Sequence, residues 1–185
     1  CNETQTLLIF DEIQTCFGRL GTLFGFEKYE VIPDILCIAK GMGGGMPIGA
    51  FISSWKLMNL LTFKPKLGHI TTFGGHPVNC SASLACLEHL LATDIMQEVE
   101  EKGQLFRLHL KHPKIKEIRG KGLMLSIEFD DEELAKKLVE QSLENGLILF
   151  YFLFTKTAIR ITPPLTISKK EIEKGCYIIL GILNA

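Results

Sequence analysis

Three short apolar segments near the start of the chain limit its fold more than any other feature. They cover residues 6–10, 34–39 and 50–54, and Pro33 and Gly49 stand directly before the second and the third. Apolar segments of this length are typical of strands buried on both faces, as in a parallel sheet. The glycine-rich residues 41–49 and the residues 68–77 predict loops. We therefore expect an α/β unit at the start of the chain.

The rest of the chain predicts a second α/β pattern. A helix is expected from Pro77 to about Leu91, because Pro suits a first helical turn and the small side chains suggest close packing. An amphipathic helix follows over residues 95–110. We then expect strands over residues 114–119, 123–129, 147–150 and 157–162, a helix over residues 131–144, and a last helix opened by a Ser168–Glu171 capping box.

The length of 185 residues suggests one or two domains at about 150 residues each. We predict the C-terminal part of a large domain over residues 1–94. A connecting helix and a small C-terminal α/β domain are predicted over residues 95–185. Hydrophobic residues make up 46% and charged residues 22%, a composition that excludes a disordered tail or a collagen-like fibre.

Charge and cysteine usage limit the partners and the compartment. The formal charge of −1 argues against a nucleic-acid partner, because such proteins show a basic excess. The longest apolar run, residues 147–154, is much shorter than the about 20 residues of a membrane helix. The polar N-terminus lacks the basic region of a signal peptide. The six cysteines contain no CxxC pair, so we expect reduced thiols, no metal site and a cytoplasmic protein.

Two of the apolar segments are followed by an ionisable residue and then a turn. Asp11 follows the first and Lys40 the second, next to the glycine-rich loop. Ligands of open parallel sheets bind beyond the carboxyl ends of the strands, so both residues are candidates for function. A lysine there could be a desolvated amine with a depressed pKa, which a nucleophile requires. A helix-capping carboxylate and a solvated lysine are the alternatives that the spacing leaves open.

Three further residues are candidates for binding anions. Thr71 and Thr72 could donate hydroxyls to a phosphate, or could bond their own backbone as turn residues do. Residues 41–45 resemble an anion cradle but match neither GxGxxG nor a P-loop. Arg160 lies late in an apolar strand and needs an anionic partner if it is buried. A substrate carboxylate and an internal Asp or Glu are both open as that partner.

Six segments of the chain resemble the class III aminotransferases, which are pyridoxal-phosphate enzymes of fold type I. Within that family, the chain resembles the ornithine and acetylornithine aminotransferase group. Each segment alone is modest evidence, but six in the family's order and approximate spacing are specific and span essentially the whole chain. The segments are residues 8–15, 33–41, 43–50, 71–75, 119–123 and 158–165.

The resemblance implies a role for each candidate. Lys40 matches the lysine that binds the cofactor covalently and moves the proton between the substrate α-carbon and the cofactor. Asp11 matches the aspartate that pairs with the pyridine nitrogen, and a protonated nitrogen makes the ring an electron sink. Ile13 matches the side chain that packs on the ring, and Gln14 a residue near the phenolic oxygen.

The other implied roles concern the phosphate and the substrate. Thr72, together with Thr71, matches the group that reaches the phosphate of the partner subunit's cofactor. Arg160 matches the arginine that binds the substrate carboxylate. Two positions depart from the family pattern: Cys16 stands where Gly is usual, which is costly if that position needs a positive φ, and His76 stands where Asn is usual.

The expected function is transfer of an amino group from an ornithine-like or other ω-amino donor to 2-oxoglutarate by a ping-pong mechanism. The family implies a homodimer with shared active sites and a protein about twice as long as this chain. Another class III reaction, as in an aminomutase, decarboxylase or racemase, begins with the same Lys40 and Asp11 chemistry. An inactive truncated remnant is a third hypothesis.

Overall fold

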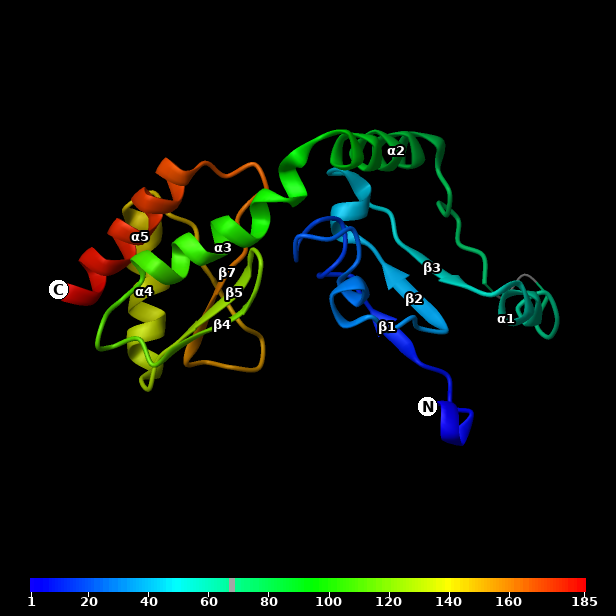
Figure 1. The fold of residues 1–185 in the computed structure, drawn as a ribbon, viewed down its shortest axis with the longest axis horizontal. Helices are drawn as coiled ribbons and strands as arrows, with labels where there is room; N and C mark the ends of the chain where they lie inside the picture. The colour runs from blue at the N-terminus through cyan, green and yellow to red at the C-terminus, as the bar shows by residue number, and fades with distance from the viewer. Residues whose placement is uncertain (67–68) are drawn as a thin grey trace. The chain divides into compact units, whose positions relative to one another are not determined.

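The computed structural model describes residues 1–66 and 69–185, which form two compact units (Figure 1). The first unit contains Cys1–Gly18 and Thr22–Asp94, and the second contains Arg19–Gly21 and Ile95–Ala185. The sequence did not predict that Arg19–Gly21 would belong to the second unit. The assignment of residues 1–94 and 95–185 to a large and a small domain stays a prediction.

The first unit has a three-stranded sheet in the order β1 (Ile9–Asp11), β2 (Ile35–Ile38) and β3 (Ala50–Ser53). β1 and β2 are parallel, with Asp11 opposite Cys37. β3 is antiparallel to β2, so the expectation that all three strands are parallel is wrong. The link from β2 to β3 is short and contains only a 3₁₀ turn, whereas a parallel pair needs a longer crossover.

The strands of this unit are also less buried than predicted. Leu36 and Ile38 of β2 are buried, but Ile9 and Ile52 on the outer strands are exposed. The structure adds a helix that the sequence did not predict, α1 (Trp55–Leu60), whose first turn is capped when Leu57 N donates to Ser54 Oγ. The remaining elements are η1 (Asn2–Thr4), η2 (Gly25–Tyr29), η3 (Lys40–Gly43) and α2 (Pro77–Ala92).

α2 begins at Pro77, as predicted, and His76 caps it because Val78 N donates to His76 Nδ1 at 3.3 Å. The imidazole therefore performs the capping function that Asn performs elsewhere. The loop expected over residues 68–77 is found at residues 69–76, which are turns and irregular backbone, and Pro77 already belongs to α2. Gly68 lies outside the described residues.

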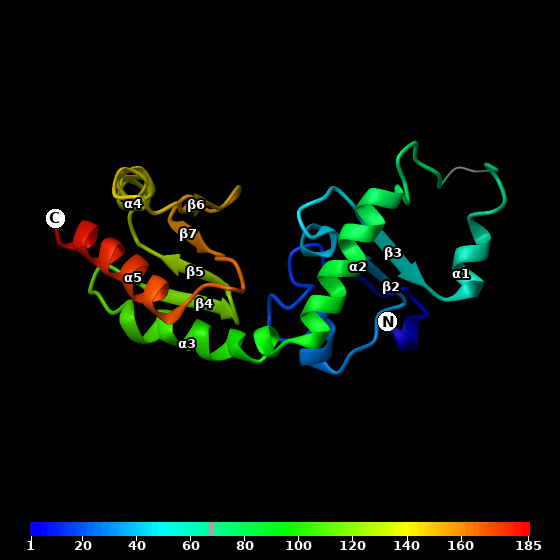
Figure 2. The ribbon, with the colours of Figure 1, turned by 90° about the horizontal axis from the view of Figure 1, so that it is seen from above.

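The second unit is an antiparallel sheet with three helices on one face (Figure 2). The strand order is β4-β5-β7-β6, and β5 and β7 are central. Leu125, Ile127, Ile159 and Ile161 alternate with outward side chains and are buried against the helices, which gives the single hydrophobic core of the described part of this unit. The bounds are η4 (Asp94–Met96), α3 (Glu98–His109), β4 (Glu117–Lys121), β5 (Met124–Glu128), α4 (Glu132–Glu144), β6 (Phe150–Tyr151), β7 (Ala158–Ile161) and α5 (Lys169–Asn184).

Most of these elements match the sequence analysis, and the differences have local causes. β6 is shorter than the strand expected over residues 147–150, because Leu147 N donates to Ser142 O and completes the end of α4. The capping box of α5 is confirmed: Glu171 N donates to Ser168 Oγ and Ser168 N donates to Glu171. No helix in residues 1–66 or 69–185 has the length and hydrophobicity needed to cross a membrane.

Two cationic side chains of the second unit donate hydrogen bonds to backbone carbonyls in the loops next to β5 and β7. Arg19 donates to Leu123 O at 3.1 Å and to Pro163 O at 2.6 Å, and its burial lowers the pKa of the guanidinium. Lys102 is buried and donates to Leu165 O at 2.7 Å. The loop that follows β7 therefore accepts hydrogen bonds at two carbonyls, Pro163 O and Leu165 O. The bonds of Arg19 to Leu123 O and Pro163 O explain why Arg19–Gly21 belong to this unit.

A close backbone approach between α3 and the β4–β5 turn accompanies these contacts. Gly103 is buried in α3, and a Cβ there would overlap the carbonyl oxygen of Gly122. Gly181, within α5, is exposed and has open space where a Cβ would stand. The packing therefore requires a glycine at position 103 and does not require one at position 181.

We predict opposite effects of two alanine substitutions on the free energy of unfolding. Gly103→Ala forces α3 away from the turn and lowers it by about 1–3 kcal/mol. Gly181→Ala, the matched control, raises it by about 0.5–1 kcal/mol because Ala favours the helix. Urea unfolding followed by circular dichroism measures both. A Gly103→Ala chain at least as stable as the parent would contradict the close approach.

Candidate active site

The parallel pairing of β1 and β2 brings Asp11 and Lys40 to the same edge of the sheet. Asp11 is the last residue of β1, and Lys40 follows β2 after Ala39. Both residues are exposed. The predicted placement of a carboxylate and an amine beyond the carboxyl ends of neighbouring strands is therefore found, although their roles stay predictions.

Lys40 has an unusual backbone conformation. Its φ is +48°, in the left-handed region that a residue with a Cβ rarely occupies. Such a conformation costs about 1–2 kcal/mol and persists where surrounding contacts impose it, often at functional sites. The desolvated environment suggested for this lysine is not found in this chain, because the residue is exposed.

α2 provides the contacts that hold the loop after Lys40. Asn79 Nδ2 donates to Pro47 O at 2.6 Å, and Cys86 Sγ donates to Gly41 O at 3.4 Å. Gly44 lies so close to the helix that a Cβ would come within 2.9 Å of Ala82 O. The small side chains of α2 therefore allow close packing, as the sequence predicted, and the partner is the glycine-rich loop.

The turn after β1 carries the other residues of the candidate cofactor site. Ile13 N donates to Asp11 Oδ1 at 3.0 Å, so the aspartate closes a local turn. Ile13 is half-buried and Gln14 is exposed. This turn presents Asp11, Ile13 and Gln14 within four residues of one segment.

The sequence analysis missed Glu12, which lies in the middle of this turn. Its side chain is 3% exposed. Gly25 N and Phe26 N each donate to the carboxylate at 2.5 Å, and Thr15 Oγ1 donates at 2.9 Å. Nothing in the sequence indicated that Glu12 is buried, because its two backbone donors, Gly25 N and Phe26 N, lie in a separate segment of the chain.

Cys16, the departure from the family's Gly, causes no backbone strain. The positive φ belongs to the next residue, Phe17, at +53°. The Cys16 thiol is buried and donates to Ala39 O at 3.7 Å, and its burial raises the pKa of the thiol. Cys16 thus packs against the residue before Lys40.

Thr71 and Thr72 are not hydrogen-bonded to Asp11 or Lys40 in the part of the chain that the structure describes. Thr71 and Thr72 are exposed on the loop before α2. Thr71 O accepts from Gly74 N at 3.3 Å, which is the bonding of an ordinary turn. Within the described residues neither threonine bonds Asp11 or Lys40, so their phosphate role stays a prediction from resemblance.

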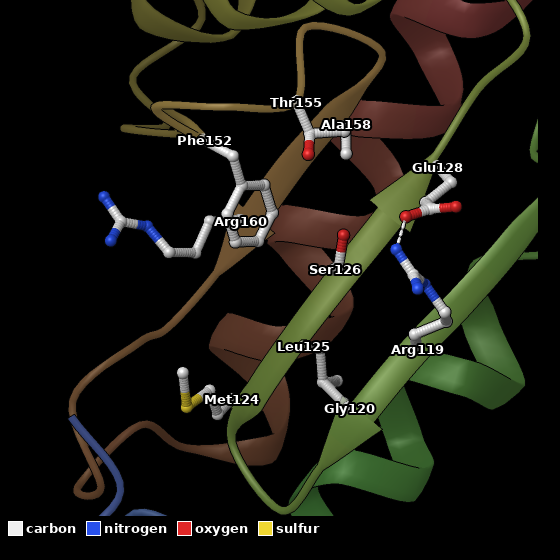
Figure 3. A pocket seen from close by; sticks show the side chains of 10 residues that line it. All are labelled: Arg119, Gly120, Met124, Leu125, Ser126, Glu128, Phe152, Thr155, Ala158 and Arg160. Carbon is white, nitrogen blue, oxygen red and sulfur yellow. Dashed lines mark hydrogen bonds and ion pairs between the residues drawn. The ribbon is translucent and has the colours of Figure 1, made fainter. Parts of the chain in front are cut away.

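Arg160 lies on the face of the second sheet that the helices do not cover. It is in register with Ser126 on β5 and Phe150 on β6. The guanidinium carbon lies 5.6 Å from the centre of the Phe150 ring and 5.9 Å from that of Phe152. Figure 3 shows this side chain pointing away from Arg119 and its partner Glu128.

The internal acidic partner considered for Arg160 is not present in the part of the chain described. The nearby Glu128 pairs with Arg119 instead, and Arg160 Nε is buried without a hydrogen-bond partner. Arg160 lines two cavities, of about 240 Å³ and about 410 Å³. A guanidinium that has no acidic partner among the described residues and lies near two aromatic rings is suited to binding a carboxylate.

No metal site accompanies these residues. Across residues 1–66 and 69–185, no group of three or more His, Cys, Asp or Glu side chains could hold a metal ion. The chemistry available at the sheet edge is that of an amine, a carboxylate, an amide and an apolar side chain.

Comparisons with known proteins identify the family. A family model described as aminotransferase class-III matches residues 1–183. The acetylornithine aminotransferase of Caldanaerobacter subterraneus subsp. tengcongensis is 41% identical over 189 residues, which cover 100% of this chain and 46% of that protein. That of Haemophilus ducreyi is 39% identical and covers 100% of this chain and 45% of that protein. The chain spans about half the length of the curated relatives it matches.

Solved structures agree in fold. An aminotransferase of Bacillus anthracis superposes with a TM-score of 0.91 at 30% identity, covering 100% of this chain and 46% of that one. An (S)-enantioselective omega-transaminase of Thermomicrobium roseum superposes with a TM-score of 0.89 at 34% identity, covering 99% and 44%. The fold is that of fold type I transferases, in its C-terminal portion, as the resemblance implied. The chain belongs to the class III aminotransferase family.

Proposed function

We propose that the protein to which this chain belongs is a pyridoxal-phosphate-dependent aminotransferase. Its substrates are an ornithine-like or other ω-amino donor and 2-oxoglutarate, in a ping-pong reaction. The observation that carries the proposal is the parallel β1–β2 pair, which delivers Asp11 and Lys40 to one sheet edge. Relatives named as acetylornithine aminotransferase, ornithine aminotransferase and omega-transaminase support this donor class.

The residues present fit pyridoxal phosphate in their chemistry. The cofactor offers an aldehyde, a ring nitrogen, a phenolic oxygen and a phosphate, and when bound it supplies an electron-accepting ring. The Lys40 amine makes no ion pair among the described residues and suits the aldehyde. Asp11 Oδ1 accepts a hydrogen bond from Ile13 N. Oδ2 is therefore available to accept a hydrogen bond from the protonated ring nitrogen of the cofactor.

The other contacts follow the resemblance. Ile13 packs on the ring and Gln14 bonds near the phenolic oxygen, both from the turn that Asp11 closes. Thr71 and Thr72 donate hydroxyls to the phosphate of the partner subunit's cofactor. This arrangement requires a homodimer, and we propose a cytoplasmic homodimer with shared active sites.

The chain's own residues supply proton movement and substrate orientation. Lys40 Nζ would take the proton from the carbon that bears the donor's amino group and deliver it to the cofactor. In the second half of the reaction it would move a proton in the opposite direction, onto the acceptor carbon that receives the amino group. The Arg160 guanidinium holds the substrate carboxylate, and the Phe150 and Phe152 rings exclude water from that contact. We also propose that residues 1–94 belong to the large cofactor-binding domain, and that residues 95–185 form the connecting helix and the small domain.

We predict that Lys40→Ala abolishes the near-visible absorption band that pyridoxal phosphate acquires on the protein, because Nζ forms the covalent link. Lys56→Ala, which removes an exposed lysine from α1, leaves the band unchanged. Absorption spectra of the three chains with added cofactor measure this. A folded parent without a band would contradict the proposed function and favour the inactive-remnant hypothesis.

We predict that Arg160→Lys raises the KM for 2-oxoglutarate roughly 10- to 100-fold, since one charge-assisted, bidentate contact is lost. The affinity for the cofactor stays unchanged. Arg119→Lys on the same sheet face is the control, because Arg119 already pairs with Glu128. Steady-state transfer assays give both KM values. A different product without any 2-oxoglutarate-dependent transfer would instead indicate another class III reaction.

A further inference from the structure

Glu12 is a buried carboxylate that the proposed reaction does not use. Three donors from other positions of the chain surround it: Thr15 Oγ1, Gly25 N and Phe26 N. Gly25 and Phe26 are the first two residues of η2, so the carboxylate lies at the N-terminus of that short helix. No ion pair of Glu12 occurs in the described residues, and these three donors account for the burial of its charge.

Both backbone polar groups of Glu12 are hydrogen-bonded, as its side chain is. Glu12 N donates to Cys37 O at 2.9 Å, which extends the β1–β2 ladder past Asp11. Glu12 O accepts from Cys16 N at 3.1 Å. The residue between Asp11 and Ile13 is therefore bound to β2 on one side and to η2 on the other.

This double attachment has a consequence for Asp11. The Asp11 carboxylate is oriented by Ile13 N, and the Ile13 amide follows Glu12 directly in the chain. We infer that loss of the Glu12 side-chain bonds would shift the peptide group that carries this N–H. Asp11 is exposed and has no other bond in the described residues that could hold its rotamer.

We propose that Glu12 is a positioning residue: its carboxylate, bound to η2 and Thr15, holds the turn from which Asp11 and Gln14 meet the pyridine ring. The inference rests on the proposed function, because that proposal supplies pyridoxal phosphate as the ligand of Asp11 and Gln14. It adds a residue that acts on the cofactor only through Asp11 and Ile13, and it assigns to η2 the role of an anchor.

The first test measures the turn without cofactor, by hydrogen exchange of backbone amides in Glu12→Gln. The Gln side chain places an NH₂ group against backbone donors, so Gly25, Phe26 and Ile13 are all expected to exchange roughly tenfold faster. Leu36 in β2 stays unchanged. Faster exchange at Gly25 and Phe26 alone would overturn the proposal, because Glu12 would then stabilise only its own loop.

Two variants keep this test interpretable. Thr15→Val removes one neutral donor to Glu12 and is expected to give a smaller change in the same direction, should Glu12→Gln fail to fold. Glu27→Gln is the matched control, since Glu27 accepts from Phe24 N at η2 but does not contact the turn. It is expected to leave the Ile13 amide unchanged, and an equal effect there would contradict the proposal.

The second test measures the dissociation constant of pyridoxal phosphate in a double-mutant cycle. Glu12→Gln is expected to weaken binding roughly tenfold when Asp11 is present and by less than twofold in the Asp11→Ala background. Equal losses in both backgrounds would show that Glu12 acts without Asp11. Absence of cofactor binding by the parent would contradict the proposed function itself, while the exchange experiment would still decide the role of Glu12.

Discussion

The parallel register of β1 and β2 is the constraint on which the candidate site depends. It places Asp11 opposite Cys37, so both strands end at one edge and the next residues of each turn lie beyond it. An antiparallel pairing would send Asp11 and Lys40 to opposite edges, and their common chemistry would be lost. The positive φ of Lys40 and the hydrogen-bonded turn at Glu12 are local features that depend on this strand arrangement.

The two units use different means to hold their loops. In the first unit, close helix packing and a buried carboxylate fix the segments after β2 and β1. In the second, Arg19 and Lys102 donate to backbone carbonyls of the loop that follows β7, at Pro163 and Leu165. Both means hold loop backbone in place next to the strands, and they leave Asp11 and Lys40 exposed.

Local patterns predicted much of this fold. The end of β1 at Asp11, the end of β2 just before Ala39 and Lys40, the start of α2 at Pro77 and the α5 capping box follow from nearby residues. The structure confirms each of them. The direction of β3, the burial of Glu12 and the place of Arg19 depend on distant contacts. Arg19, for example, bonds carbonyls 104 and 144 residues away. A local pattern of apolar and polar residues does not indicate a hydrogen-bond partner so far away in the sequence. These three features were therefore found only in the structure.

The central claim is that Lys40 binds pyridoxal phosphate covalently. Its most direct test is borohydride reduction of the protein mixed with the cofactor, followed by digestion and peptide mass spectrometry. The proposed site predicts a phosphopyridoxyl group on the peptide that contains Lys40, and predicts that Asp11→Ala reduces its yield. A label on another lysine, or no label on a folded protein, would contradict the claim.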